Sequence, residues 1–195
     1  MAKKTYKPTM LTQEAYNTLN NARIYLQKRT SSRITFNDTI SEFIGKKLAL
    51  MELEPTLREY IFSFVEQISK SSEIRGVILY GSVAKGTSGK FSDIDLFIMI
   101  EGDEQAFYEK TARAAFENTE KIHKELLSKG IYSSISPLIL SLKRLSEFSP
   151  LFLDILDYGI VLYDRKNTAD DFLSSLRKIK HKRLKIAGVE VLEWT

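Results

Sequence analysis

The chain has 195 residues, of which 43% are hydrophobic and 28% are charged. This composition is typical of a soluble globular protein with one or two domains. The sequence contains no cysteine, no apolar run long enough to span a membrane, and no apolar signal core near its N-terminus. These absences exclude disulfide-stabilised folds and thiolate metal sites, and they predict a cytoplasmic protein that does not enter a membrane.

The positive charge is concentrated toward the N-terminus. The whole chain has a formal net charge of +4, whereas residues 1–53 carry nine Lys or Arg and four Asp or Glu, a net charge of +5. Such an asymmetry indicates a polyanion partner for this segment. The alternative is that these basic side chains lie on solvent-exposed helix faces and bind no partner. Charge by itself favours this alternative.

Residues 1–53 have the pattern of a small strand-helix-helix module. The extended segment "TYKPTML" precedes a helix that begins at Thr12 and runs to about Lys28. Thr35 is a suitable N-cap for a second helix, and the apolar residues of both helices recur at helical spacing. A module of this size buries too little apolar surface to be stable alone, so we expect it to dimerise or to pack on the rest of the chain.

Residues 54–195 alternate between helical and extended patterns and form the second predicted domain. The expected order is a helix after Pro55, strand 76–80, a Gly/Ser loop 81–92, strand 94–100, a helix over 103–129, strand 131–140, short helices to about 157, strand 159–163, a helix over 169–184 and an extended segment 186–194. Tyr80 and Tyr132 are expected in the core. The pattern predicts an α/β fold in which helices flank a mixed sheet.

Two aspartates stand at the start of the predicted strand 94–100. Residues i and i+2 of a strand point to the same face, so Asp93 and Asp95 present two carboxylates side by side. Their repulsion raises one pKa unless a cation lies between them. Mg²⁺ suits such a pair, because it takes one or two carboxylates and completes its shell with water and phosphate oxygens. A turn cap is the alternative for a D-x-D pattern without further context.

The loop before this strand has the composition of a phosphate-binding turn. Gly81 permits a tight turn or a close approach of the backbone to a ligand. Ser82 is then expected at the start of a short helical turn, where N–H groups favour phosphate. Lys85 and Lys90 add positive charge nearby. A phosphate cradle and a metal-binding pair are therefore predicted on neighbouring strands.

The spacing of Gly81-Ser82, ten further residues and Asp93-Ile94-Asp95 resembles the signature of the polymerase-β-type nucleotidyltransferases, and most closely that of the minimal nucleotidyltransferases. The resemblance covers residues 56–165. It implies transfer of a nucleoside monophosphate from an NTP, expected to be ATP, to an acceptor hydroxyl. The implied nucleotide-binding residues are Gly81, Ser82, Lys85 and Ser92, and the implied catalytic residues and Mg²⁺ ligands are Asp93 and Asp95.

One feature of that family is missing from the sequence. Members carry a third carboxylate on the strand after the long helix, whereas residues 126–146 contain no Asp or Glu. Ser136 or Leu138 holds the matching position. Asp154 and Asp157 are candidates from outside this strand to replace the third carboxylate. The simpler interpretation is that both lie on the exposed face of a helix. Nucleotide and single-metal binding tolerate the loss, whereas efficient transfer depends on the third carboxylate.

Residues 12–48 resemble a ribbon-helix-helix DNA-binding domain of the CopG type. The resemblance implies a homodimer that lays a two-stranded ribbon in the major groove, so we expect DNA binding through residues 1–50. A helical hairpin used only for dimerisation is the alternative. The implied DNA contacts are Lys4, Tyr6, Lys7 and Thr9 in the ribbon and Thr35 and Asn37 at the second helix.

Together these patterns predict a Mg²⁺-dependent nucleotidyltransferase domain joined to a dimerising, DNA-binding module. In minimal relatives paired with toxins the acceptor can be a hydroxyl of the partner protein, so the resemblance implies a protein acceptor here as well. The alternative is a DNA-binding regulator or antitoxin whose nucleotidyltransferase domain no longer catalyses. The missing third carboxylate favours the regulator, and the intact glycine-serine and aspartate pattern favours the enzyme.

Overall fold

The computed structural model of the chain describes residues 52–147, 149–178, 181–186 and 189–194, together with Tyr16, Asn20, Ile24, Thr35 and Leu50. The chain divides into two units, residues 1–45 and 46–195, and all the elements named below belong to the second unit. The predicted strand-helix-helix module of residues 1–53 lies almost entirely outside the described residues. Within it, Tyr16, Asn20 and Ile24 have helical backbone.

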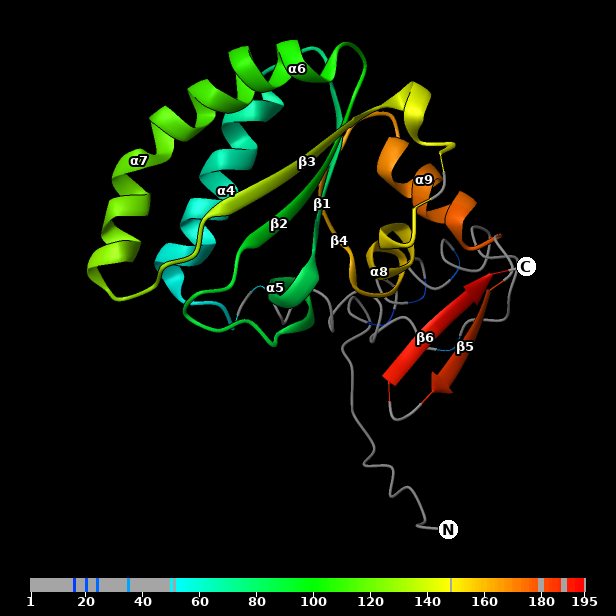
Figure 1. Cartoon of the computed structure of the whole chain (residues 1–195). Coiled ribbons are helices and arrows are strands. Elements are labelled where there is room, and N and C mark those ends of the chain that lie inside the picture. The colour runs from blue at the N-terminus through cyan, green and yellow to red at the C-terminus, as the bar shows by residue number, and fades with distance from the viewer. Residues whose placement is uncertain are drawn as a thin grey trace. The chain divides into compact units, whose positions relative to one another are not determined.

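The second unit alternates between helices and strands (Figure 1). In chain order its elements are α4 (Pro55–Ser69), β1 (Ile74–Tyr80), α5 (Gly81–Lys85), β2 (Ile94–Ile100), α6 (Glu104–Phe107), the π-helical turn η2 (Tyr108–Ala112), α7 (Arg113–Ser128), β3 (Ile135–Ser141), the 3-10 turn η3 (Leu142–Arg144), α8 (Leu151–Tyr158), β4 (Ile160–Asp164), α9 (Thr168–Leu176), β5 (His181–Ile186) and β6 (Val189–Trp194). In the described part of the chain, no helix combines the length and the apolar character that crossing a membrane requires.

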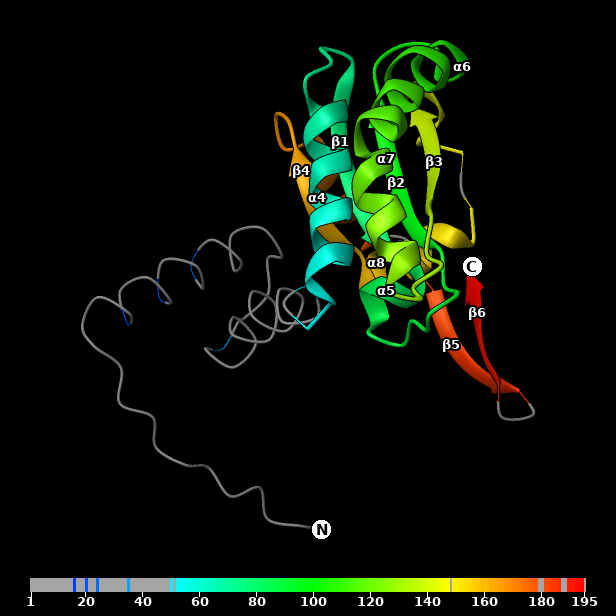
Figure 2. The same ribbon diagram turned by 90° about the vertical axis from the view of Figure 1, so that its left-hand side faces the viewer.

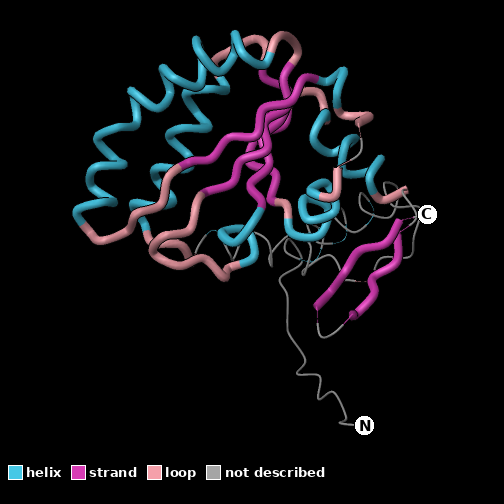
Figure 3. The backbone as a smooth tube through the Cα atoms, viewed as in Figure 1, coloured by secondary structure: helices cyan, strands magenta, loops and turns pink. Residues whose placement is uncertain are grey.

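Four of the strands form one mixed sheet in the order β3-β2-β1-β4. Strand β1 pairs antiparallel with both β2 and β4, whereas β2 pairs in parallel with β3. Helices lie on both sides of this sheet (Figures 1 and 3). The predicted α/β fold with a mixed sheet flanked by helices is therefore confirmed, and the predicted strand 94–100 coincides with β2.

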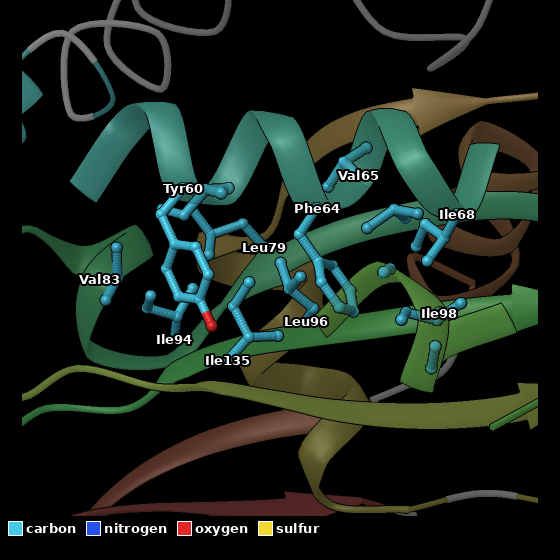
Figure 4. Close-up of a cluster of buried hydrophobic side chains, with 14 of the residues drawn as sticks. Tyr60, Phe64, Val65, Ile68, Leu79, Val83, Ile94, Leu96, Ile98 and Ile135 are labelled. Carbon is cyan, nitrogen blue, oxygen red and sulfur yellow. The ribbon is translucent and has the colours of Figure 1, made fainter. Parts of the chain in front are cut away.

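Helices cover both faces of the sheet because the central strands are apolar on both sides. On one face α4 and α7 pack side by side (Figure 2), and Phe64 of α4 lies in the core with Leu96 of β2 (Figure 4). On the other face α8 and α9 pack together, and Phe97 of β2 contacts Phe152 of α8 at 5.6 Å between ring centroids. The two cores hold β1 and β2 rigidly between them.

The predicted helix over 169–184 is too long. Helix α9 ends at Leu176, and residues 181–186 form strand β5 of a hairpin with β6. The hairpin register sets Lys182 opposite Glu193 and Lys185 opposite Glu190. Residues 181–186 therefore pair with β6 instead of continuing the helix.

The predicted strand 131–140 begins four residues late, at Ile135. The N–H group of Tyr132 donates to the carbonyl oxygen of Lys90 at 2.7 Å, and the N–H group of Ile131 donates to Leu126 at the end of α7. These bonds anchor the segment to the loop before β2 and to α7. The backbone therefore reaches the β2 ladder only at Ile135, which opposes Ile94.

Candidate active site

The connection from β1 to β2 begins with a tight turn into a short helix. Gly81 has a φ angle of +70°, a conformation that glycine adopts without steric cost, and it starts α5 immediately after Tyr80. Gly86 ends α5 in the left-handed conformation. The predicted position of Ser82 at the start of a short helical turn is confirmed, because Ser82 is the second residue of α5.

The Gly81 turn lies directly against the carboxylate of Asp95. Tyr80 and Asp95 are register partners in the antiparallel pair of β1 and β2, so the residue after Tyr80 passes close to the Asp95 side chain. A Cβ atom built on Gly81 would overlap Asp95 Oδ2 and would lie 2.9 Å from Asp95 Cγ. Only glycine fits this position without moving the carboxylate.

The two predicted metal ligands stand at the same end of the sheet. Asp95 is the second residue of β2 and is half-buried, whereas Asp93 immediately precedes the strand and is exposed. Along β2 the side chains alternate between faces, and Phe97 and Met99 belong to the core under α8 and α9. Asp95 therefore lies on the face of the sheet that α8 covers.

The electrostatics of this end of the sheet favour a bound cation. Burial raises the pKa of Asp95, and so do the negative charges of Asp93 and Asp154, whereas Lys85 acts in the opposite direction. Burial together with the charges of Asp95 and Asp154 raises the pKa of Tyr80 to about 12. The negative charge is thus only partly compensated. The donor set fits Mg²⁺, which binds one or two carboxylates and takes phosphate oxygens and water for its other positions.

Among the described residues, no group of three or more His, Asp or Glu side chains is arranged to hold a metal ion. The matching position on the third strand is occupied by Ser136, which is the register partner of Asp95 on β3 and is exposed. Leu138 pairs with Phe97 and packs on the core. A cation at the aspartate pair therefore depends on oxygens from a ligand.

Lys85 and Asp154 form an ion pair that links the loop to α8. The distance from Lys85 Nζ to Asp154 Oδ1 is 2.5 Å, and the two side chains are 33% and 29% exposed. Lys85 Nζ also lies 4.8 Å from the centroid of the Tyr158 ring. The sequence places Lys85 beside a nucleotide and Asp154 on a surface helix face, whereas in the structure the two side chains pair with each other next to Asp95.

Ser92 closes the end of the loop. Its hydroxyl accepts a hydrogen bond from the Gly89 N–H group at 2.8 Å, and its own N–H group donates to the Gly89 carbonyl oxygen. These bonds position the chain just before Asp93. The serine predicted to bind nucleotide has a turn-forming role in this structure.

Sequence reasoning missed an exposed aromatic pair beside Asp93. The rings of Phe91 and Tyr132 stack with their centroids 5.2 Å apart and their planes at 6°. Phe91 is 78% exposed and Tyr132 is 53% exposed, so the expectation of a buried Tyr132 is wrong, whereas Tyr80 is buried as expected. The two residues are 41 positions apart in the sequence, so their stacking depends on the fold and no local pattern indicates it.

Comparisons with known proteins give a family match and a similar protein. A model of the family described as "Polymerase beta, Nucleotidyltransferase" matches residues 63–168, more than half of the chain. A protein of Methanocaldococcus jannaschii, provisionally named a protein adenylyltransferase, is 24% identical over 148 residues, which cover 72% of this chain and 95% of that protein.

Two solved structures have a weaker overall similarity. A crystal structure described as a toxin-antitoxin with AMP-PNP has 17% sequence identity and a TM-score of 0.37, covering 60% of this chain and 81% of its own. A crystal structure of a provisionally named nucleotidyltransferase from Sulfolobus solfataricus has 17% identity and a TM-score of 0.33, covering 63% of this chain and 94% of its own.

Replacement of Gly81 by alanine should disrupt the carboxylate pair. The added methyl group displaces the Asp95 carboxylate, so we expect Mn²⁺ or Mg²⁺ affinity in the presence of ATP to fall by at least about tenfold, roughly 1.4 kcal/mol, in titration calorimetry. Gly86→Ala is a matched control, because Gly86 has the same φ of +70° but no atom within 4 Å of a built Cβ. Both variants should lose about 1 kcal/mol of stability from the left-handed backbone. Equal metal affinity in the two variants would contradict the close contact between Gly81 and the Asp95 carboxylate.

Replacement of Asp95 by asparagine should stabilise the fold at neutral pH. Because the pKa of Asp95 is raised in the folded state, its stabilising contribution is present when it is protonated, below about pH 3.9, and is lost as pH rises through the raised pKa. We therefore expect Asp95→Asn to unfold at a higher temperature than wild type at pH 7 without metal. The difference should shrink as pH falls toward 4, as followed by circular dichroism. A difference in unfolding temperature that does not change with pH would contradict a raised pKa of Asp95.

Proposed function

Because this chain belongs to the polymerase β nucleotidyltransferase family, we propose that it transfers a nucleoside monophosphate from Mg²⁺-bound ATP to a hydroxyl group of a partner protein. The observation that carries this proposal is the contact of the Gly81 turn with the Asp95 carboxylate. It joins a turn suited to phosphate with a carboxylate pair suited to a cation. The name of the M. jannaschii relative supports a protein as the acceptor.

Each residue of the site has a defined part in this proposal. Asp93 and Asp95 would hold the cation, with triphosphate oxygens as its further ligands. The Gly81 turn lets the backbone approach the phosphates, and Ser82 donates hydrogen bonds to them. Mg²⁺ bound at the pair would supply positive charge against the negative charge that develops during transfer. The rigid β1–β2 pair holds these groups in place before substrate arrives, which is what electrostatic stabilisation requires.

The transfer itself is an in-line displacement at the α-phosphorus. The acceptor oxygen forms a bond to the α-phosphorus, the bond from that phosphorus to the bridging oxygen breaks, and pyrophosphate leaves with the bonding electrons. The acceptor hydroxyl must lose its proton as it attacks. Positioning the hydroxyl in line with the leaving oxygen supplies much of the rate acceleration. A docked protein surface positions its hydroxyl better than a small molecule does.

The second candidate function is DNA binding and dimerisation by the N-terminal segment, in a regulator or antitoxin. The net charge of +5 on residues 1–53 favours it, because lysine and arginine contacts to phosphate release counterions. This function is compatible with a transferase, and it stands alone if the nucleotidyltransferase domain binds nucleotide without transferring it.

Transfer should be detectable with α-labelled ATP and a co-purifying or genomically adjacent partner protein. We expect label on the partner and a mass increase of one nucleoside monophosphate on a hydroxyl-bearing residue. Asp93→Asn/Asp95→Asn should lower the rate by at least about 100-fold, because the charge stabilisation at the pair is lost. Labelling that persists in the double variant would rule out this site.

Removal of residues 1–45 should leave a folded monomer without DNA affinity. The cut preserves Leu50, which is buried in the larger core, and Glu54, whose carboxylate caps α4 at Leu57. Light scattering should show a dimer for the full chain and a monomer for residues 46–195, and DNA binding by the full chain should weaken steeply with salt. A shortened chain that remains dimeric or binds DNA equally well would exclude this function for the N-terminal segment.

A further inference from the structure

The Lys85–Asp154 ion pair holds together two groups that both belong beside the triphosphate. Lys85 is the last residue of α5, the short helix that begins at the Gly81 turn. Its ammonium group contacts Asp154 at 2.5 Å and lies over the ring of Tyr158, so two residues of α8 hold the side chain. One cation of the loop that the proposed function assigns to phosphate is therefore paired with a carboxylate of α8.

Asp154 also lies on the same side of the sheet as the aspartate pair. Helix α8 packs on both α5 and β1, and its Phe152 belongs to the core that contains Tyr80. Tyr80 is the register partner of Asp95. The ion pair with Lys85 at the end of α5 brings the Asp154 carboxylate to the same end of the sheet as the Gly81 turn. Asp154 thus supplies a further carboxylate from a helix, whereas strand β3 offers only Ser136 level with Asp95.

We propose that Asp154 is the carboxylate that accepts the acceptor's proton, and that the Lys85–Asp154 ion pair keeps it covered until a triphosphate binds. The proposal rests on the transferase function proposed above. In the free protein Lys85 neutralises Asp154. When ATP binds, Lys85 moves to the phosphates, and Asp154 is left beside the site without its cation.

The exchange is favourable because the two competitors for Lys85 differ in charge. Asp154 carries a single negative charge, whereas the triphosphate carries several, and Lys is a common partner for phosphate. Both side chains of the pair are about one third exposed, so breaking it opposes binding, and the larger charge of the triphosphate must offset that cost. Nucleotide binding and exposure of the base are thereby coupled, and an acceptor is activated only when ATP is in place.

The group-transfer step then balances within the site. The acceptor oxygen bonds to the α-phosphorus and its proton passes to Asp154. The bond to the bridging oxygen breaks and pyrophosphate leaves with the electron pair. A general base in this position typically contributes 10²–10⁴-fold to the rate. Asp154 is a catalytic residue in this scheme, and Lys85 binds substrate.

The test compares Asp154→Asn with wild type in the full chain and uses two readouts. The first is binding of α,β-methylene-ATP with Mg²⁺ by calorimetry, because this analogue cannot release pyrophosphate. Asp154→Asn frees Lys85, so we expect affinity to rise about three- to fivefold. Lys85→Met should lower affinity about tenfold, as expected for loss of a charge-assisted hydrogen bond. Asp157→Asn, a loss of one carboxylate from the same helix, should change affinity less than about twofold.

The second readout is transfer of labelled nucleoside monophosphate to the partner protein. Despite its tighter nucleotide binding, Asp154→Asn should transfer at least about 100-fold more slowly, while Asp157→Asn should stay near the wild-type rate. Asp154→Glu keeps a carboxylate and should retain measurable transfer. Thermal unfolding of each variant checks that the fold is intact, and the glutamate variant carries the test if the asparagine variant does not fold.

The two readouts separate failure of this proposal from failure of the proposed function. Unchanged or weaker analogue binding by Asp154→Asn would overturn the ion-pair exchange. Wild-type transfer by Asp154→Asn would overturn its role as the base. A wild-type protein that binds the analogue with Mg²⁺ but transfers to no partner would contradict both the proposed function and the role of Asp154 as a base. The binding measurements would still decide whether Lys85 moves from Asp154 to the phosphates.

Discussion

The close approach of the Gly81 backbone to the Asp95 carboxylate is the constraint on which the site depends. It follows from the register that sets Tyr80 opposite Asp95 in the central antiparallel pair and from the absence of a side chain at position 81. A shift of one residue in this register would move Asp95 to the other face of the sheet. The two cores that cover β1 and β2 prevent such a shift, so packing far from the site determines its geometry.

The same packing makes the site electrostatically costly. Asp95 is half-buried beneath α8 with the charges of Asp93 and Asp154 nearby, and its pKa is raised accordingly. Lys85 relieves part of this repulsion but is itself shared with Asp154. Stability is thus reduced where function requires concentrated negative charge, a common balance in proteins whose sites bind cations. A bound cation would complete the charge compensation that Lys85 alone leaves unfinished.

Much of the framework was predictable from the sequence, because it depends on local patterns. Strand β2 coincides with the predicted strand, and the predicted helix after Pro55 forms as α4. The positions of Asp93 and Asp95 at the start of β2 follow from the same local pattern. The position of Asp154 was not predictable, since it depends on how α8 packs across the sheet, a contact between residues distant in sequence. The end of α9 and the β5–β6 hairpin were also missed, because residues 181–186 pair with the strand that follows them instead of continuing the helix.

The most direct test of the account is a crystal structure of the full chain with Mg²⁺ and α,β-methylene-ATP. The account expects one metal ion about 2.1 Å from oxygens of both Asp93 and Asp95, with triphosphate oxygens completing its shell and lying against the Gly81-Ser82 turn. A triphosphate bound elsewhere on the protein, or a metal ion that contacts neither aspartate, would contradict the claim that turn and carboxylates form one nucleotide site.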